Sequence, residues 1–246
     1  MRKYLNILAA LVLIFVLWHF ASALTARAFF PGPIKTFEAI LLLNTKGVLF
    51  PHLTASIYRI VIAVFLSTIF AAILGLAAGR VKRVDDFLSP IIYLLHPLPK
   101  TAMLPVIMLF MGFGEASRIF LVGFIVFSQM LLNIRDAAKQ TPAELLDSVR
   151  SMGAGRAGMF AHVIVPSVLP GFFTGLRVSL GTAVAVLFLA ETFASQSGLG
   201  FLIMDAWTRL AYAEMYAAIL VLGFAGLALF VVTDLAEALL CPWNAE

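Results

Sequence analysis

Four ionisable residues lie inside or beside long apolar runs of the sequence: His96, Lys100, Arg177 and Glu191. An ionisable side chain in the hydrocarbon region of a membrane costs roughly 2.5–3.5 kcal/mol on insertion scales. Because of this cost, such residues line solute pathways or pair with one another. We therefore predict that these four are candidates for lining a translocation pathway, in which Lys100 would offer a positive site to an anion.

Three of these residues also have structural alternatives, which the sequence leaves open. Lys100 lies in a proline-broken segment, and such breaks are tolerated where a segment lines a cavity, but it could instead pair with Glu191. Glu191 could gate the outer mouth of a pathway, or it could cap the loop that leads to residues 198–200. For Arg177, a structural ion pair or a headgroup contact is favoured over contact with a solute.

The sequence contains no arrangement of residues that is typical of an enzyme. Its four histidines are scattered without metal-ligand spacing, and the single cysteine, Cys241, lies near the end beside Pro242. It has no Gly-x-x-x-x-Gly-Lys-Ser/Thr run, with which ATPases hold phosphate groups. We therefore expect no catalytic site, no metal and no cofactor in this chain.

Residues 135–166 form the one substantial polar connection between apolar runs. Residues 141–144, Thr-Pro-Ala-Glu, have the pattern of a capping box with proline at the first helical position. An apolar stripe follows, and Gly153 is expected to end this helix in a left-handed turn. A second short helix should begin near Arg156 and end at Pro166. Two such helices could fit a groove on a partner protein, or they could lie on lipid headgroups.

The elements that must position these residues are membrane-spanning helices. The chain has 246 residues, of which 62% are hydrophobic and 12% are charged, whereas soluble domains carry roughly 25% charged residues. This composition excludes a soluble or disordered chain, and we predict an all-α integral membrane protein with a single transmembrane domain over residues 1–246. A span needs about 20 apolar residues, and six runs qualify: 5–24, 60–78, 87–113, 119–134, 168–190 and 215–232.

Basic residues set the predicted orientation, with both termini in the cytoplasm. The cleanest inner cluster is the run 80–83, Arg-Val-Lys-Arg, which we assign to membrane orientation and not to nucleic-acid binding. Arg59 and Arg118 fall on the predicted outer side. The first apolar run could be a signal peptide, but its length favours a retained helix. Residues 33–47 are predicted to form an amphipathic helix on the outer surface.

Small and polar residues indicate how the spans pack. Glycines four residues apart, at positions 75 and 79 and again at 171 and 175, allow helices to approach closely. The run 119–134 is short and contains polar residues, so it should face protein or a wet cavity instead of lipid. Those polar residues are Ser128, Gln129 and Asn133.

The polar connection and its surroundings resemble the membrane-spanning permease subunits of type I ABC importers. The loop of that family carries an acid, a glycine and a proline at fixed separations, which fall here on Asp147, Gly153 and Pro166. Residues 148–149, Ser-Val, stand where the family has two alanines, so the short motif alone is degenerate. Further segments resemble the branch that imports nitrate, sulfonates and taurine: 97–99, 144–147, 153–156, 169–171, 174–177, 190–191 and 197–200.

The resemblance implies a type I permease fold of six transmembrane helices, with a cytoplasmic coupling helix between helices 4 and 5. It also implies partners: a second copy as a homodimer, a dimer of ATP-binding subunits that binds the ATP, and an external solute-binding protein, all at a bacterial or archaeal inner membrane. The coupling residues would be Glu144, Asp147, Gly153, Ala154, Arg156 and Pro166.

The predicted solute is a small anion of the sulfonate, taurine or nitrate type, imported at the expense of ATP. The alternative within the family is a thiamin-precursor pyrimidine or another small heterocycle. Outside the family, the alternative is a secondary carrier driven by an ion gradient, although such carriers often have internal repeats and buried acidic ion sites.

Overall fold

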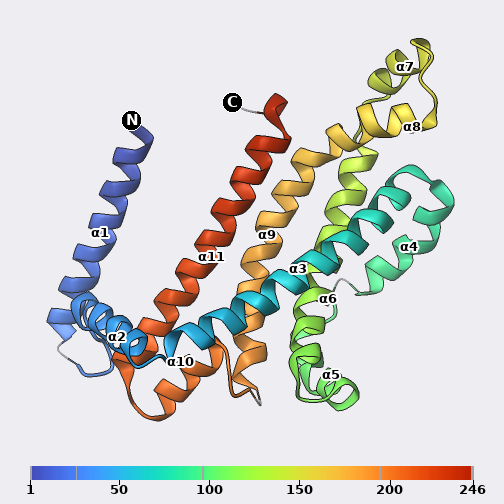
Figure 1. The fold of residues 1–246 in the computed structure, drawn as a ribbon. Coiled ribbons are helices and arrows are strands. Elements are labelled where there is room, and N and C mark those ends of the chain that lie inside the picture. The colour runs from blue at the N-terminus through green and yellow to red at the C-terminus, as the bar shows by residue number, and fades with distance from the viewer. Residues whose placement is uncertain (1, 26, 96, 194, 245–246) are drawn as a thin grey trace. The chain divides into compact units, whose positions relative to one another are not determined.

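A computed structural model describes residues 2–25, 27–95, 97–193 and 195–244. These residues form helices and connecting turns, and none of them is in a strand (Figure 1). The helices are α1 Arg2–Thr25, α2 Pro33–Thr45, α3 Leu49–Arg80, α4 Lys82–Leu95, α5 Leu104–Met111, α6 Glu115–Lys139, α7 Ala143–Ser151, α8 Arg156–Met159, α9 Val165–Thr192, α10 Leu199–Thr208 and α11 Tyr212–Leu240, with short helical turns η1 Lys100–Met103, η2 Phe160–Ile164 and η3 Pro242–Asn244.

Among the described residues, four helices are long and apolar enough to cross a membrane. They are α3, α6, α11 and the continuous helix Arg156–Thr192. A bent pair, Lys82–Leu95 with Lys100–Met111, makes a fifth span if it is counted as one, and it turns by 82° at the break. The all-helical class is therefore confirmed, as is the predicted break in the proline-rich run.

The chain divides into two compact units. The first combines Met1–Ser56 with Glu191–Phe224, and the second combines Ile57–Ala190 with Ala225–Glu246. Helices α1, α2 and α10 belong to the first unit and α4 to α8 to the second, while α3, α9 and α11 contribute residues to both.

The second unit is built around α6, which contacts α3 and α9 through glycines. A Cβ atom added to Gly75 of α3 would lie 3.0 Å from the Cβ of Ile134, and one added to Gly175 of α9 would lie 2.9 Å from the Cβ of Asn133. Backbones this close leave no room for a side chain on the glycine. The predicted packing role of both glycine pairs is confirmed.

The predicted stop at Pro166 is wrong. Helix α8 continues through η2, a π-helical turn, into α9, so that one helix runs from Arg156 to Thr192. In η2 the amide of Val165 donates to the carbonyl of Phe160, one residue further back than in an α-helix. Pro166 follows directly, in the first turn of α9, where the wider turn accommodates a residue that has no amide N–H.

The predicted connection 135–166 is shorter than the sequence suggested. Helix α6 runs on to Lys139, so residues 135–139 are helical and Ala138 is buried. The connection between α6 and α8 is therefore residues 140–155, with α7 inside it.

Helix α2 confirms that a helix forms within residues 33–47. Its buried positions include Ala39 and Leu43, whereas Ile34, Phe37 and Leu41 are exposed. A helix that keeps several large apolar side chains on its exposed face is typical of a membrane interface.

Candidate functional site

The docking loop, which we define as residues 140–155 together with α8 and Phe160, projects beyond the ends of α6 and α9 (Figure 1). Gly153 lies in it with a φ of +84°. Its amide donates to the Arg150 carbonyl at 2.9 Å, and the amide of Ala154 donates to the Val149 carbonyl at 3.2 Å. This pair of bonds is a Schellman motif, which satisfies the last carbonyls of a helix through one left-handed residue. The expected turn at Gly153 is confirmed.

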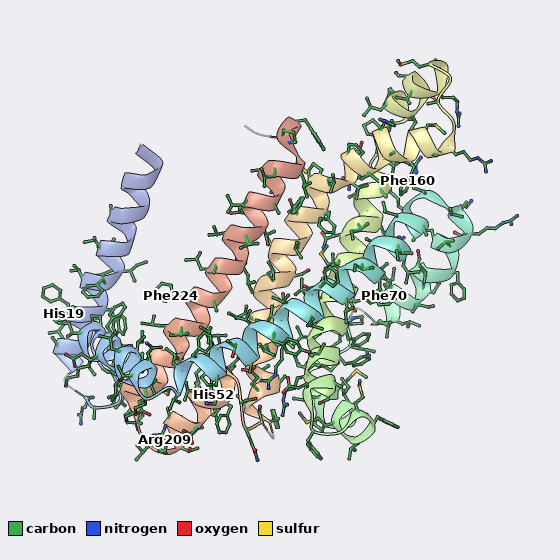
Figure 2. All side chains as sticks on the ribbon, viewed as in Figure 1. His19, His52, Phe70, Phe160, Arg209 and Phe224 are labelled. Atoms are coloured by element: carbon green, nitrogen blue, oxygen red, sulfur yellow. The ribbon has the colours of Figure 1, made fainter. Side chains whose placement is uncertain are left out.

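The docking loop exposes large apolar side chains. Met152 is 85% exposed and Leu145 is 48% exposed, and Phe160, directly after α8, is also exposed (Figure 2). Asp147 forms an exposed ion pair with Arg150 at 3.9 Å within α7. Large apolar side chains exposed on a loop that projects from the helices are typical of a surface that another molecule covers.

The predicted capping box at residues 141–144 is wrong. Helix α7 begins at Ala143 and its N-cap is Pro142, in an extended conformation with no side-chain capping bond. The proline occupies the N-cap position that Thr141 needed, so the Thr141 hydroxyl is one residue too early. That hydroxyl is buried and has no hydrogen-bond partner among the described residues.

An ionic brace joins α4 to the end of α6, directly before the docking loop. Asp85 of α4 accepts from Arg135 Nε at 2.5 Å and from Lys139 Nζ at 2.6 Å. Arg135 also donates to the hydroxyl of Ser89 at 2.8 Å. The sequence showed the charges on both sides of this brace but did not indicate that they pair.

Arg177 forms an ion pair within the protein, in agreement with the structural role that the sequence favoured over contact with a solute. On α9 it donates through Nε to Asp234 at 2.5 Å and through a second nitrogen to Glu237, both on α11. Sequence reasoning missed these two acids because they follow the end of the last apolar run.

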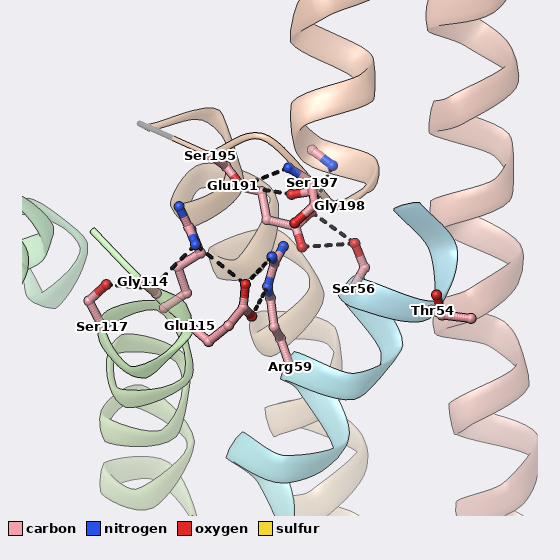
Figure 3. Close-up of polar contacts among 12 residues, drawn as sticks. Thr54, Ser56, Arg59, Gly114, Glu115, Ser117, Glu191, Ser195, Ser197 and Gly198 are labelled. Carbon is pink, nitrogen blue, oxygen red and sulfur yellow. Dashed lines mark hydrogen bonds and ion pairs between the residues drawn. The ribbon is translucent and has the colours of Figure 1, made fainter. Parts of the chain in front are cut away.

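Glu191 is fully buried in the first unit, where it satisfies the start of α10 (Figure 3). Its carboxylate accepts the hydroxyl of Ser56 at 2.8 Å and the amide of Gly200 at 2.8 Å. The Ser56 hydroxyl oxygen in turn accepts the amide of Leu199 at 2.8 Å, and His52 Nδ1 accepts the amide of Gly198 at 3.1 Å. The backbone amides of residues 198, 199 and 200 therefore all donate to side chains. This geometry matches the alternative in which Glu191 caps the loop that leads to residues 198–200. His52 and Ser56 were missed, since nothing in their sequence surroundings marks them.

A charge cluster of two buried arginines and the half-exposed Glu115 lies in the second unit. Arg59 of α3 donates twice to Glu115 of α6, through Nε and Nη2, each at 2.6 Å (Figure 3). Arg118 lies 3.6 Å from the same carboxylate. Arg59 is 0% exposed and Arg118 is buried. Each lies inside a helix, where the Glu115 carboxylate makes burial of the guanidinium tolerable.

Lys100 lies in η1, at the bend of the broken span, and its side chain is partly buried. This position agrees with the predicted proline break. The other candidate of that segment, His96, lies outside the described residues.

Residues 67–244 match the family described as the binding-protein-dependent transport system inner membrane component. The chain belongs to this family. It is therefore the multi-pass permease component of a binding-protein-dependent ABC importer, and ATP is bound by a separate subunit and not by this chain.

Relatives and solved structures agree with this assignment. The permease is 32% identical over 241 residues to the taurine transport system permease protein TauC of Escherichia coli, covering 96% of this chain and 88% of TauC. It is 31% identical to the putative aliphatic sulfonates transport permease protein SsuC of Bacillus subtilis, covering 87% and 78% of the two chains. A chain of the MetNI methionine ABC transporter in an inward-facing conformation has the same fold, with a TM-score of 0.60, 18% identity and 75% and 94% coverage.

The ionic brace gives a first test in this permease. Asp85→Asn removes the charge that holds Arg135 and Lys139, and a hydrogen bond to a charged group contributes about 1.5–3 kcal/mol. We expect several-fold less solute transported per ATP hydrolysed, because α4 no longer follows the end of α6. The measurement is the ratio of transport to ATPase activity in proteoliposomes. Asp86→Asn, at an exposed neighbouring acid, is the control, and an equal ratio in both variants would contradict the brace.

Proposed function

We propose that this permease pairs with a second copy to import a small organic sulfonate of the taurine type, driven by ATP-binding subunits that dock on the docking loop. In this arrangement α1 is a sixth span, both termini are cytoplasmic, and α2 lies at the outer membrane surface. The 32% identity with a permease named for taurine transport supports the solute class.

The docking loop is the observation that carries the ATPase contact. Its two helices meet at Gly153, where a Cβ atom would have no neighbour within 4 Å. The exposed Leu145, Met152 and Phe160 give the loop an apolar surface, and burying such side chains contributes roughly 25 cal/mol per Å². A groove on each ATP-binding subunit would cover this surface, and movement of the groove would move α6 and α9 together.

Gly153→Trp tests this contact. A left-handed conformation costs a residue with a Cβ roughly 1–2 kcal/mol, and the indole would also stand on the docking surface. We expect the variant to insert and purify normally but to lose co-purification with the ATP-binding subunit or the rise in ATPase activity with loaded binding protein. Both are measured on the complex in lipid.

Gly47→Trp is the matched control, because Gly47 ends α2 with the same pair of hydrogen bonds, a φ of +70° and open space around its Cβ position but lies outside the docking loop. Its complex should form and respond to binding protein. If Gly153→Trp behaves like this control, the docking assignment fails. The same assay ranks solutes: taurine and alkyl sulfonates should stimulate hydrolysis, whereas a response to thiamin-precursor pyrimidines alone would favour the alternative solute.

A further inference from the structure

In the half of α6 nearest the docking loop, the exposed face of the helix is polar, although α6 is a membrane-spanning helix. Gln129, Asn133, Asp136 and Gln140 follow one another at helical spacing and so share one face. The side chains of Asn133 and Gln140 are exposed, and those of Gln129 and Asp136 are partly exposed. We call these four residues the α6 stripe.

The part of helix α11 in the same unit, from Ala225 onward, has an exposed apolar face that lipid would accept. Leu227, Val231 and Leu235 share one face at the same kind of spacing, and Val231 and Leu235 are 49% and 60% exposed. Lipid accepts such a face, whereas polar side chains at the same depth are costly unless they face protein or water. The α6 stripe therefore does not face lipid.

Helix α9 extends the polar surface beside the stripe. The amide nitrogen of Gln129 donates to the Thr182 hydroxyl at 3.2 Å, and the Asn133 side chain packs over Gly175. Thr174 lies one residue before that glycine and is exposed. An amide NH2 group has two N–H donors, so the Gln129 amide can donate a second hydrogen bond besides the one to Thr182.

The charge and position of the stripe fit a path for a small solute. Asp136, its one charged residue, has Arg135 at 3.8 Å, and the other three are neutral amides. The stripe ends at Gln140, where the docking loop begins. It therefore occupies the half of the span nearest that loop. Neutral donors bind an oxyanion weakly enough for it to leave, as conduction requires.

We propose that the α6 stripe lines the water-filled inner half of the solute path and donates hydrogen bonds from its amides to sulfonate oxygens. The proposal rests on the proposed function, because it takes the solute class from it. It differs from the expectation that Lys100 or Arg177 recognises the solute, since the donors named here are the uncharged amides of the stripe and not its one acid, Asp136.

Cysteine accessibility in the assembled complex tests the proposal. Starting from C241S, whose native thiol is buried, Gln129→Cys and Asn133→Cys are compared with Val231→Cys and Leu235→Cys on α11. The reagent is sulfonatoethyl methanethiosulfonate, which is membrane-impermeant and carries a sulfonate, applied to inside-out vesicles. Only the thiolate reacts, and it forms in water and not in lipid, so labelling of the stripe should be at least about tenfold faster than labelling of α11. Taurine should slow it.

Each outcome decides the matter. Stripe cysteines as unreactive as those of α11 would show that a second copy or another protein covers the stripe, and would overturn the proposal. Rapid labelling that taurine leaves unchanged would also overturn it. If Gln129→Cys fails to assemble, Asn133→Cys carries the test, because its side chain is exposed. Assembly with the ATP-binding subunit is scored separately by co-purification, so failure of the proposed function is distinguishable from failure of the stripe.

Discussion

Replacing Gly79 with leucine should stop α3 from packing against α6, and the permease should be lost from detergent extracts as a monodisperse species. A Cβ atom on Gly79 would overlap the Cβ of Ala138 and would lie 2.8 Å from the carbonyl oxygen of Arg135. Because that oxygen belongs to the backbone, only separation of the two helices relieves the overlap. Overpacking costs about 1–3 kcal/mol or more, and we expect the upper end here.

Two quantities are measured: the yield of monodisperse protein by size-exclusion chromatography, and the thermal unfolding midpoint of the purified protein. Gly223→Leu is the control, since Gly223 lies in helix α11 with nothing within 4 Å of its Cβ position. It should be neutral or slightly stabilised, because leucine favours a helix by up to about 1 kcal/mol over glycine. Ala138→Gly should partly rescue Gly79→Ala by removing one of the two overlaps. Equal yields for the leucine variants at 79 and 223 would contradict the close α3–α6 contact.

Five of the six predicted spans have counterparts in the structure when the bent pair is counted as one, but most of them were ended at or near a charged residue. The run 60–78 was begun after Arg59, and the run 119–134 was confined between Arg118 and Arg135. In the structure α3 and α6 continue through all three positions. A predicted apolar run ends at a charged residue because mean hydropathy counts every charged side chain as if it had no ion-pair partner.

Tertiary pairing explains why these helices continue. Arg59 is held by Glu115 and Arg135 by Asp85, so neither guanidinium is exposed to hydrocarbon without a counter-ion. The last predicted run, 215–232, ended for the same reason before Asp234, which pairs with Arg177. A pair between distant segments leaves no local signal, and its members could not be predicted from one sequence.

Features that depend only on residues close together in the sequence were predicted more reliably. The turn at Gly153 requires a left-handed residue, and the glycine pairs require only small side chains at a fixed spacing, so both could be predicted. The capping box failed because Pro142 itself took the N-cap, and the stop at Pro166 failed because a π turn absorbed the proline. In the first case the helix began one residue later than the capping box required, and in the second the helix did not end at the proline.

Glu191→Ala should destabilise the permease by about 3 kcal/mol or more. It removes the acceptor of the Gly200 amide and of the Ser56 hydroxyl, both buried. Hydrogen bonds to charged groups contribute about 1.5–3 kcal/mol each, and a buried polar group left without a partner costs about 1–3 kcal/mol. The negative carboxylate also lies at the positive end of α10, where it is favourable. The thermal unfolding midpoint of the purified permease measures the loss.

Gly198→Ala should have a similar effect through the same contact. Gly198 has a φ of +107°, and an added Cβ would overlap the Glu191 carboxylate. Gly47→Ala is the matched control, because Gly47 has a φ of +70° but open space around it. The difference between the two alanine variants reports the overlap together with the larger backbone strain at Gly198, whose φ of +107° and ψ of 160° are nearly confined to glycine. Similar midpoints would contradict a carboxylate packed on residue 198.

Glu191→Gln separates capping from gating. Glutamine keeps one oxygen that can accept the Gly200 amide, so under capping it should retain part of the stability and a matching part of transport. Ser56→Ala should then couple to Glu191→Ala in a double-mutant cycle, because the two side chains share one hydrogen bond. A gate depends on the charge and not on the acceptor: a glutamine variant with wild-type stability and no transport would restore the gating interpretation and contradict the cap.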